Sequence, residues 1–172
     1  MDFNDITKAT ILDVAEIFNL YKLSIKAFEA KGIYQWNDEY PTREDLQDNV
    51  AAGSTWILKG DGEIRAAVTL DDQQDPQYGG INWAYTTGKI LVIHRLVSHP
   101  AHQGKGLGRK MVFFSENFAF SNGYDVIRLD AFIGNPYSQN LYNHMNYHEA
   151  IGYCYYHHPA IMCNCFEKRI RL

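Results

Sequence analysis

Apolar residues recur near the start of the chain with the period of a helix. One set follows steps of four and three, which places its members on one helical face: Val14, Phe18, Tyr21, Ile25 and Phe28. The spacing predicts an amphipathic helix over roughly residues 11–31, ended by Gly32. Thr42, with Asp45 three residues later, has the pattern of an N-terminal cap and predicts a second, short helix over residues 42–52.

Runs rich in apolar and β-branched residues predict the strands. STWILK and EIRAAVTL flank Gly-Asp-Gly at residues 60–62, which indicates a hairpin, and KILVIHRLVSHP, residues 89–100, predicts the strongest strand. Between them, residues 71–88 are rich in turn-forming residues, and we expect an exposed excursion there. Further strands are expected over 4–9, 125–133, 147–157 and 160–168, the last two on either side of His158-Pro159.

Two more helices follow from apolar spacing and end signals. Leu107, Met111, Phe114 and Phe118 predict a helix ended by Asn122-Gly123. Asn135-Pro136 combines a good N-cap with proline at the first helical position, and this helix would turn Tyr137, Leu141 and Met145 inward. The resulting order, β-α-α-β-β-β-α-β-α-β-β, predicts one α/β domain over residues 1–172, with a mixed sheet and helices on both faces.

Charge and composition narrow the class of protein. The net charge of −4 and the pI of about 5.9 argue against a nucleic-acid partner, which usually requires a basic surface. Three cysteines, an odd number, without a secretion signal indicate reduced thiols. No apolar run approaches the ~18 residues of a membrane span. We therefore expect a cytoplasmic protein without a membrane partner.

Three glycines separate the strongest predicted strand from the helix that follows it. Gly104, Gly106 and Gly108 leave bare backbone N–H groups at the start of this helix, which is an arrangement that binds phosphate. The spacing is not that of a P-loop or of a dinucleotide fingerprint, because Arg109 stands where each motif needs another residue. It fits the pattern Q-x-x-G-x-G, which begins at Gln103.

Two stretches carry a resemblance to a known family. RLVSHPAHQGKGLGRKMV resembles the acyl-CoA-binding motif of the GNAT acyltransferase superfamily, V-x-P-x-x-[QR]-x-x-G-x-[GA], with His99 as an extra residue before the proline. The matching residues are Val97, Pro100, Gln103, Gly106 and Gly108. NPYSQNLYNHMNY resembles a second element of the family, with Asn146 and Tyr147 where the family prefers Gly and Phe. It matches at Asn135, Ser138, Leu141 and Tyr142.

The resemblance implies a fold and an activity. The fold would be GNAT-like, with a mixed, mostly antiparallel central sheet and helices on both faces. The activity would be N-acetyltransfer from acetyl-CoA to a primary amine, by direct attack in a ternary complex. The acceptor would be a small-molecule amine or an exposed protein amine. A CoA-binding or sensing domain without turnover is the alternative, and the two departures at Asn146 and Tyr147 keep it open.

The resemblance also implies where coenzyme A binds. Backbone N–H groups would bind the pyrophosphate, from Gly104, Gly106, Gly108 and Arg109. Gln103 would contact the same region of the cofactor. Leu96 and Val97 would pair by their backbone with the pantetheine arm, and Asn135 would meet that arm from the other side.

Acyl transfer to an amine needs a base for the amine and an acid for the leaving thiolate. Tyr142 matches the family's tyrosine and is the candidate acid. His94 is a candidate base because it lies two residues before Leu96, so both should face the same side of a strand. Asp130 is the second candidate, unless it pairs with Arg95 or Arg128. The cysteines are not needed as nucleophiles, and no ligand set has the spacing of a metal site.

Trp36, Glu39 and Tyr40 lie in the loop between the first two predicted helices. This region often lines the acceptor pocket in GNAT proteins, and aromatic walls with the carboxylates of Asp38 and Glu39 would suit a small cationic amine. An aromatic anchor with solvated acids is the other interpretation. Pairing of the two C-terminal strands would give a homodimer, and the oligomeric state stays open.

Overall fold

The structure is a computed structural model that describes residues 2–156 and 161–171. His158-Pro159, around which two strands were expected, lies outside the described residues. The helices and strands occur in the predicted order. They are β1 (Ile6–Lys8), α1 (Val14–Glu29), α2 (Arg43–Ala51), β2 (Thr55–Gly60), β3 (Glu63–Asp71), β4 (Ile90–Ser98), α3 (Leu107–Ser121), β5 (Val126–Phe132), α4 (Pro136–His144), β6 (His148–Tyr156) and β7 (Ile161–Arg169).

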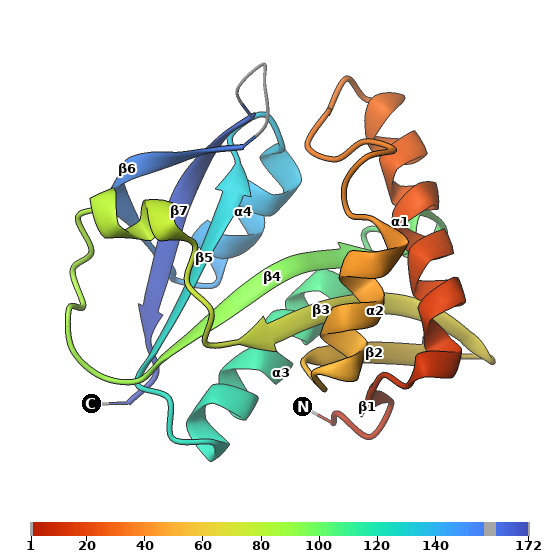
Figure 1. The fold of residues 1–172 in the computed structure, drawn as a ribbon, viewed down its shortest axis with the longest axis horizontal. Coiled ribbons are helices and arrows are strands. Elements are labelled where there is room, and N and C mark those ends of the chain that lie inside the picture. The colour runs from red at the N-terminus through yellow and green to blue at the C-terminus, as the bar shows by residue number, and fades with distance from the viewer. Residues whose placement is uncertain (1, 157–160, 172) are drawn as a thin grey trace. The chain divides into compact units, whose positions relative to one another are not determined.

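Together the elements form a mixed α/β fold with a seven-stranded, mostly antiparallel sheet, as predicted (Figure 1). The described chain divides into two compact units. The first comprises the residues up to Leu70 together with Arg95–Phe114, and the second comprises Asp71–His94 with the residues from Ser115 onward. The prediction of a single domain over residues 1–172 stays a prediction.

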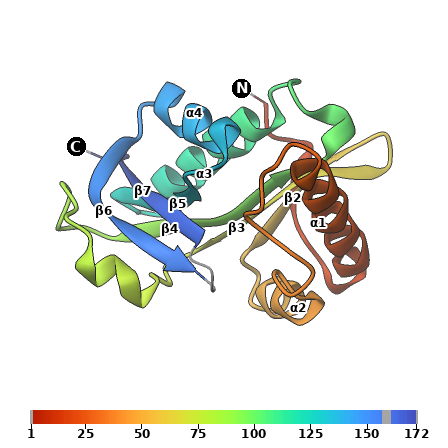
Figure 2. The same ribbon diagram turned by 90° about the horizontal axis from the view of Figure 1, so that it is seen from above.

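In the first unit, strands β1, β2 and β3 pair in antiparallel order. The hairpin between β2 and β3 turns at Asp61 and Gly62, which both have positive φ, as a tight two-residue turn requires. Helices α1 and α2 lie on the same face of β2 and β3 (Figure 2). Thr42 caps α2 through the predicted capping box, in which its hydroxyl accepts from the backbone N–H of Asp45.

The core of the first unit comes from the apolar faces of these elements. Helix α1 buries Val14, Tyr21 and Ile25 of the predicted face, whereas Phe18 and Phe28 are only partly buried. The buried residues include Val14, Ile17, Leu20, Tyr21, Leu46, Val50, Ile57, Ile64 and Val97. This core fixes the end of β4 against the helices, because Val97 belongs to it.

In the second unit, β5 pairs in parallel with the start of β4 and antiparallel with β7, which pairs with β6. Helix α4 lies on one face of these strands and the 3-10 helix η2 (Pro76–Gly80) lies on the other (Figure 2). None of the helices in the described part of the chain combines the length and apolar character that crossing a membrane requires.

The segment 71–88 is mostly exposed, as its turn-rich composition predicted, but three buried side chains, Tyr78, Ile81 and Trp83, anchor it. Tyr78 is 4% exposed and Trp83 is 8% exposed, and both belong to a core cluster with residues of β4, β6 and β7. The segment also covers the edge of β6, where Asn82 donates to the carbonyl of Ile151. These anchors attach the segment to the second unit, while its polar residues remain mostly exposed.

Helix α4 also corrects one predicted orientation. Tyr137 was expected to face inward but is 56% exposed, whereas Tyr142 and Met145 are buried. The cap itself is confirmed, because Asn135 Oδ1 accepts from the backbone N–H groups of Tyr137 and Ser138. Asn146 has a φ of 59°, so it supplies the left-handed conformation that ends the helix.

Candidate active site

The glycine turn between β4 and α3 has the backbone geometry that its sequence required. Gly104 and Gly106 have φ values of 79° and 80°, in the left-handed region that favours glycine. A Cβ built on either residue would meet no atom within 4 Å, so the backbone at both positions borders open space. Lys110 N–H donates to the carbonyl of Gly106, which starts the hydrogen-bond ladder of α3.

The first turn of α3 is suited to an anion. Its leading N–H groups, which include those of Gly108 and Arg109, precede the first intrahelical donor and point out of the helix end. The helix dipole adds a partial positive charge there. The nearby lysines contact other side chains. Lys110 pairs with Asp5 at 2.7 Å, and Lys31 donates to Gln103 Oε1 at 3.0 Å. The Arg109 guanidinium stacks over the ring of Phe113 at 5.3 Å.

Arg95 interrupts the regular pleat of β4 just before Leu96 and Val97. Its φ is 48°, a conformation that costs a non-glycine residue about 1–3 kcal/mol and persists only when its surroundings impose it. The alternation used to place His94 and Leu96 on one face requires extended backbone between them, so that argument does not apply. Val97 is buried in the core of the first unit, and Leu96 is half-buried.

The loop between α1 and α2 separates its aromatic residues into different roles. Trp36 packs edge-on against Tyr21 and Phe28, with ring centroids 5.2 and 6.4 Å apart, as an aromatic anchor would. The hydroxyl of Tyr40 accepts from Arg95 Nη1 at 3.1 Å. Glu39 is exposed, so its carboxylate is available to solvent.

Asp130 lies among hydroxyl groups rather than arginines. Its Oδ1 accepts from Tyr78 at 2.7 Å and from Tyr156 at 3.2 Å. Burial raises the pKa of Asp130 above its ordinary value, although the two phenol hydrogen bonds and the proximity of His94 act in the opposite direction. The alternative pairing with Arg128 is wrong, because that guanidinium donates to Gln74 and to the carbonyl of Tyr85.

The other two predicted catalytic residues lie in the same unit as Asp130. The imidazole Nε2 of His94 is 2.9 Å from Oδ1 of Asp71. Tyr142 is buried, and burial, with a smaller contribution from the charge of Asp130, raises the pKa of its phenol. A phenol with a raised pKa remains protonated across the physiological range and can donate a proton.

The departures of the second motif preserve the conformations that the usual residues would provide. Asn146 adopts a left-handed backbone in place of glycine. Tyr147 is buried, and its ring packs edge-on against that of Tyr142 with centroids 5.6 Å apart. The aromatic side chain therefore supports Tyr142 as a phenylalanine would.

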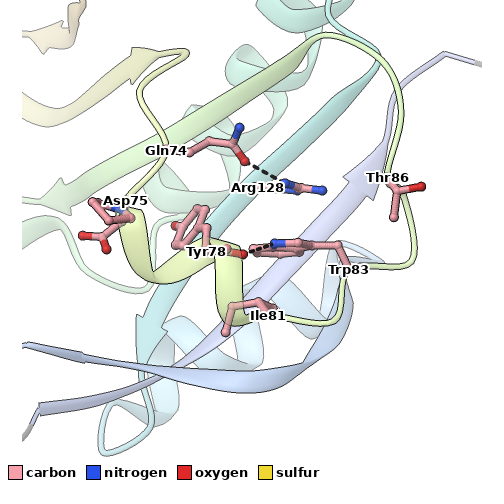
Figure 3. Close-up of a pocket in the computed structure, with 9 residues that line it drawn as sticks. Gln74, Asp75, Tyr78, Ile81, Trp83, Thr86 and Arg128 are labelled. Carbon is pink, nitrogen blue, oxygen red and sulfur yellow. Dashed lines mark hydrogen bonds between the residues drawn. The ribbon is translucent and has the colours of Figure 1, made fainter.

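A pocket of about 480 Å³ opens beside η2 in the second unit (Figure 3). Arg128 lines the pocket, and its guanidinium lies 4.2 Å from the centroid of the Trp83 ring and donates to Gln74. Tyr78 lines the same pocket, and its hydroxyl donates to Asp130. Tyr78 therefore connects the pocket to the candidate base. The other lining residues of the pocket are Asp75, Pro76, Gly79, Ile81 and Thr86.

The three cysteines are buried and free, in keeping with a structural role. The Sγ atoms of Cys154 and Cys165 are 3.5 Å apart. Among the described residues, no group of three His, Cys, Asp or Glu side chains is arranged to hold a metal ion.

Sequence reasoning missed the partners that position the predicted residues. Tyr78 and Tyr156 come from segments that carry no motif, and Asp71, the last residue of β3, was assigned to the turn-rich segment 71–88. The aromatic pair Tyr78 and Trp83 within a polar segment was the one available signal. Arg95 carried no signal at all, since a left-handed residue inside a predicted strand leaves no trace in hydrophobic spacing.

Comparison with known proteins connects this geometry to a family. The chain resembles the crystal structure of a GNAT-family acetyltransferase from Streptococcus agalactiae, with 21% identity and a TM-score of 0.78 over 95% of this chain and 94% of that one. It also resembles the PaiA N-acetyltransferase of Thermoplasma acidophilum in complex with coenzyme A, with 16% identity and a TM-score of 0.72 over 95% and 97% of the two chains.

A third similar structure is the ribosomal-protein-S18-alanine N-acetyltransferase of Escherichia coli, with 12% identity and a TM-score of 0.70 over 97% and 94% of the two chains. At these identities the likeness establishes the fold alone. No curated protein matches the chain at a significant level. The sequence model of the acetyltransferase (GNAT) family matches residues 15–147, well over half of the chain. The chain therefore belongs to the acetyltransferase (GNAT) family.

Proposed function

We propose that this protein transfers an acetyl group from acetyl-CoA to the primary amine of a small molecule, by direct attack in a ternary complex. The observation that carries the proposal is the glycine turn, where Gly104 and Gly106 hold left-handed backbone at the start of α3 and border open space. Family membership agrees with it. The three similar structures described above also agree with it, since all are named as acetyltransferases and the PaiA structure is a complex with coenzyme A.

Acetyl-CoA binds, in this proposal, along the turn and the end of β4. The N–H groups of Gly104, Gly106, Gly108 and Arg109 receive the pyrophosphate, because a helix N-terminus without side chains lets phosphate oxygens approach the amides. Gln103 flanks the pyrophosphate. The backbone of Leu96 and Val97 pairs with the pantetheine arm, and Asn135 contacts that arm from α4.

Asp130 is the base that we favour for the attacking amine. An alkyl amine with a pKa near 10.4 is almost wholly protonated at neutral pH and must lose a proton before it attacks. A carboxylate whose pKa is raised toward the working pH suits this task better than an ordinary one. His94 remains the other candidate, and Asp71 would then orient its ring.

The reaction forms a C–N bond and breaks the C–S bond of the thioester. The amine proton passes to the base, directly or through water, and the leaving thiolate of CoA takes a proton from Tyr142. The match of Tyr142 to the second motif supports this role; its phenol is protonated at neutral pH, although burial raises its pKa and makes it a weaker acid than an ordinary phenol. No covalent enzyme intermediate is required, so the buried cysteines take no part.

The acceptor amine binds, in this proposal, near the loop that carries Trp36, Glu39 and Tyr40. Glu39 is exposed, and its negative carboxylate would attract a cationic acceptor to the loop. If Glu39→Gln and Trp36→Ala each leave the acceptor KM unchanged, the loop does not form the acceptor site.

Thermal melting with acetyl-CoA, CoA and ATP in parallel tests the binding half of the proposal. A ligand at about 100 times its Kd adds roughly 2.7 kcal/mol of stability. That corresponds to several degrees, at about 2–4 °C per kcal/mol for a chain of this size. Shifts with both CoA ligands but not with ATP would support a CoA site, and no shift with any ligand would refute it.

Thiol release from acetyl-CoA with a panel of primary amines tests the catalytic half. An amine-dependent release of CoA is expected. A melting shift without release for any amine, including N-terminal peptides, would favour a CoA-binding domain without turnover.

A further inference from the structure

The side chain of Arg95 joins β4 to the segment that runs from the acceptor loop into α2. Its Nη1 donates to the hydroxyl of Tyr40, and its Nη2 donates to Oδ1 of Asn49. Tyr40 precedes α2 and Asn49 lies in the last turn of that helix, so one guanidinium contacts both ends of the segment. Its Nε is buried without a hydrogen-bond partner among the described residues, which indicates that the two Nη contacts hold the group.

The backbone of Arg95 is held as firmly as its side chain. Its carbonyl accepts from the hydroxyl of Tyr21, a side chain of α1 that is buried in the core of the first unit. The left-handed φ of 48° is unfavourable for arginine unless contacts on both sides impose it. The conformation of the peptide that leads into Leu96 thus depends on contacts made by α1, α2 and the loop.

The loop makes internal hydrogen bonds at the point where Arg95 contacts it. The backbones of Asn37 and Tyr40 are paired, and Asn37 Oδ1 also accepts from the backbone N–H of Tyr40. A change at Tyr40 is therefore transmitted to the short turn of residues 37–40. Lysine could not replace the connection, because a single ammonium lacks the planar fork with which arginine reaches two acceptors at once.

We infer that Arg95 is a positioning residue that couples the acceptor loop to the acyl-CoA-binding backbone of β4. The inference rests on the proposed function, in which Leu96 and Val97 bind the pantetheine arm. When the arm pairs with these residues, it restricts the backbone that follows Arg95. The guanidinium of Arg95 is then held in place, and its hydrogen bond to the Tyr40 hydroxyl restricts the loop in turn. Binding of CoA then prepares the loop for the amine, and binding of the amine strengthens CoA binding by the same factor.

Hydrogen–deuterium exchange of the loop amides, residues 34–42, measures this coupling without any turnover. Saturating CoA should slow exchange of these amides about fivefold or more in the wild type, at the low end of usual coupling between sites. Tyr40→Phe removes only the hydroxyl that Arg95 contacts, and the protection by CoA should be lost. Arg95→Lys should lose it as well.

Tyr34→Phe is the matched control, because it removes an exposed phenol hydroxyl from the same loop. Its CoA-dependent protection should equal that of the wild type. Protection that persists in Tyr40→Phe, or a wild-type loop that CoA leaves unprotected, would overturn the inference. Absence of CoA binding to the wild type, measured by calorimetry, would instead refute the proposed function.

Calorimetry with both ligands gives a second measurement on the same variants. In the wild type, CoA should lower the acceptor Kd, and the acceptor should lower the CoA Kd, by the same factor of about five, and Tyr40→Phe should lose both effects together, because linkage makes the coupling reciprocal. Should Tyr40→Phe lower only the melting temperature, with both effects unchanged, the Arg95 contact serves stability and not coupling.

Discussion

The hydroxyl of Tyr78 lies 2.7 Å from Oδ1 of Asp130. A donor to the ionised carboxylate lowers its pKa, so Tyr78→Phe should raise the pKa of Asp130 further. If Asp130 is the base, the acidic limb of the kcat/KM profile against pH moves to higher pH, and activity on that limb falls several-fold. Tyr153→Phe, an exposed tyrosine of β6, is the control, and an unmoved limb in Tyr78→Phe would argue against Asp130 as the base.

Replacement of Asp130 by asparagine removes the base and retains the shape of the side chain. General base catalysis contributes about 10²- to 10⁴-fold, so kcat should fall by that amount while the CoA Kd changes little. His94→Gln is the comparison, because it removes the competing candidate. The larger of the two losses in kcat identifies the base, and equal losses would indicate that the two side chains act as one unit.

Asp130 also makes the folding stability depend on pH in a definite direction. Its pKa is raised in the folded state, so the folded protein binds the proton more tightly than the unfolded chain. Its contribution to stability is therefore present in full below the unfolded pKa near 3.9 and is lost as pH rises through the folded pKa. The difference in free energy of unfolding between the wild type and Asp130→Asn, measured with urea at several pH values between these two, should therefore shift against the wild type as pH rises. An unchanged pH dependence in the variant would contradict the raised pKa.

Tyr142→Phe should lower kcat about 10²-fold near neutral pH if the phenol protonates the leaving thiolate. The loss should shrink as pH rises above about 8.5, since a thiolate of ordinary basicity then leaves without a proton. The measurement is the rate of thiol release from acetyl-CoA by the wild type and the variant, from neutral pH to above about 8.5. A constant loss at every pH would argue against proton donation to the thiolate, since the variant removes only the hydroxyl and keeps the ring that contacts Tyr147 and Phe166.

The fold could be predicted from the sequence wherever a single local signal controls an element. Steps of three and four in α1, the capping box at Thr42 and the cap at Asn135 each specify their element by short-range physics. The anchoring of the segment 71–88 could not be predicted in this way. Its polar composition correctly predicts exposure of most of its residues, but the anchoring of Tyr78 and Trp83 depends on contacts with strands far along the chain.

The candidate site also has a part that local sequence predicts and a part that depends on distant residues. The glycine turn was predictable because positive φ favours glycine, and Gly106, one of its two positive-φ residues, also belongs to the acyl-CoA-binding motif. The surroundings of Asp130 were not, since Tyr78 and Tyr156 approach it from 52 and 26 residues away. Arg95 was missed because its conformation is imposed by Tyr21, Tyr40 and Asn49, and nothing in the strand sequence itself requires it.

Gly104→Ala should affect both stability and CoA binding, for separable reasons. The left-handed backbone disfavours a Cβ by about 1–2 kcal/mol, which lowers the melting temperature by several degrees. The added methyl group also occupies the open space that the pyrophosphate is proposed to approach. Gly32→Ala is a matched control, with a φ of 73° and open space around it.

Both glycine variants should therefore lose similar stability, and only Gly104→Ala should lose affinity for CoA. Melting with and without CoA provides the comparison. Equal CoA shifts in the two variants would leave the turn without a role in binding.

Glu167 and Arg128 are ladder partners on β7 and β5, and their buried side chains approach to 3.9 Å. Glu167 also accepts from the backbone N–H groups of Ala84 and Tyr85, so it anchors the end of the segment 71–88. Glu167→Ala leaves the Arg128 charge buried without its partner and should cost about 3–5 kcal/mol. That is a fall of roughly 6–20 °C in melting temperature.

The paired variant Glu167→Leu with Arg128→Met separates the charge from the packing. Replacing both ionic partners by apolar residues avoids an uncompensated buried charge, so the double variant should be more stable than Glu167→Ala. Part of the loss should remain, because the N–H groups of Ala84 and Tyr85 lose their acceptor in either case. A double variant as unstable as Glu167→Ala would show that anchoring of the segment, and not charge pairing, is the main contribution of Glu167.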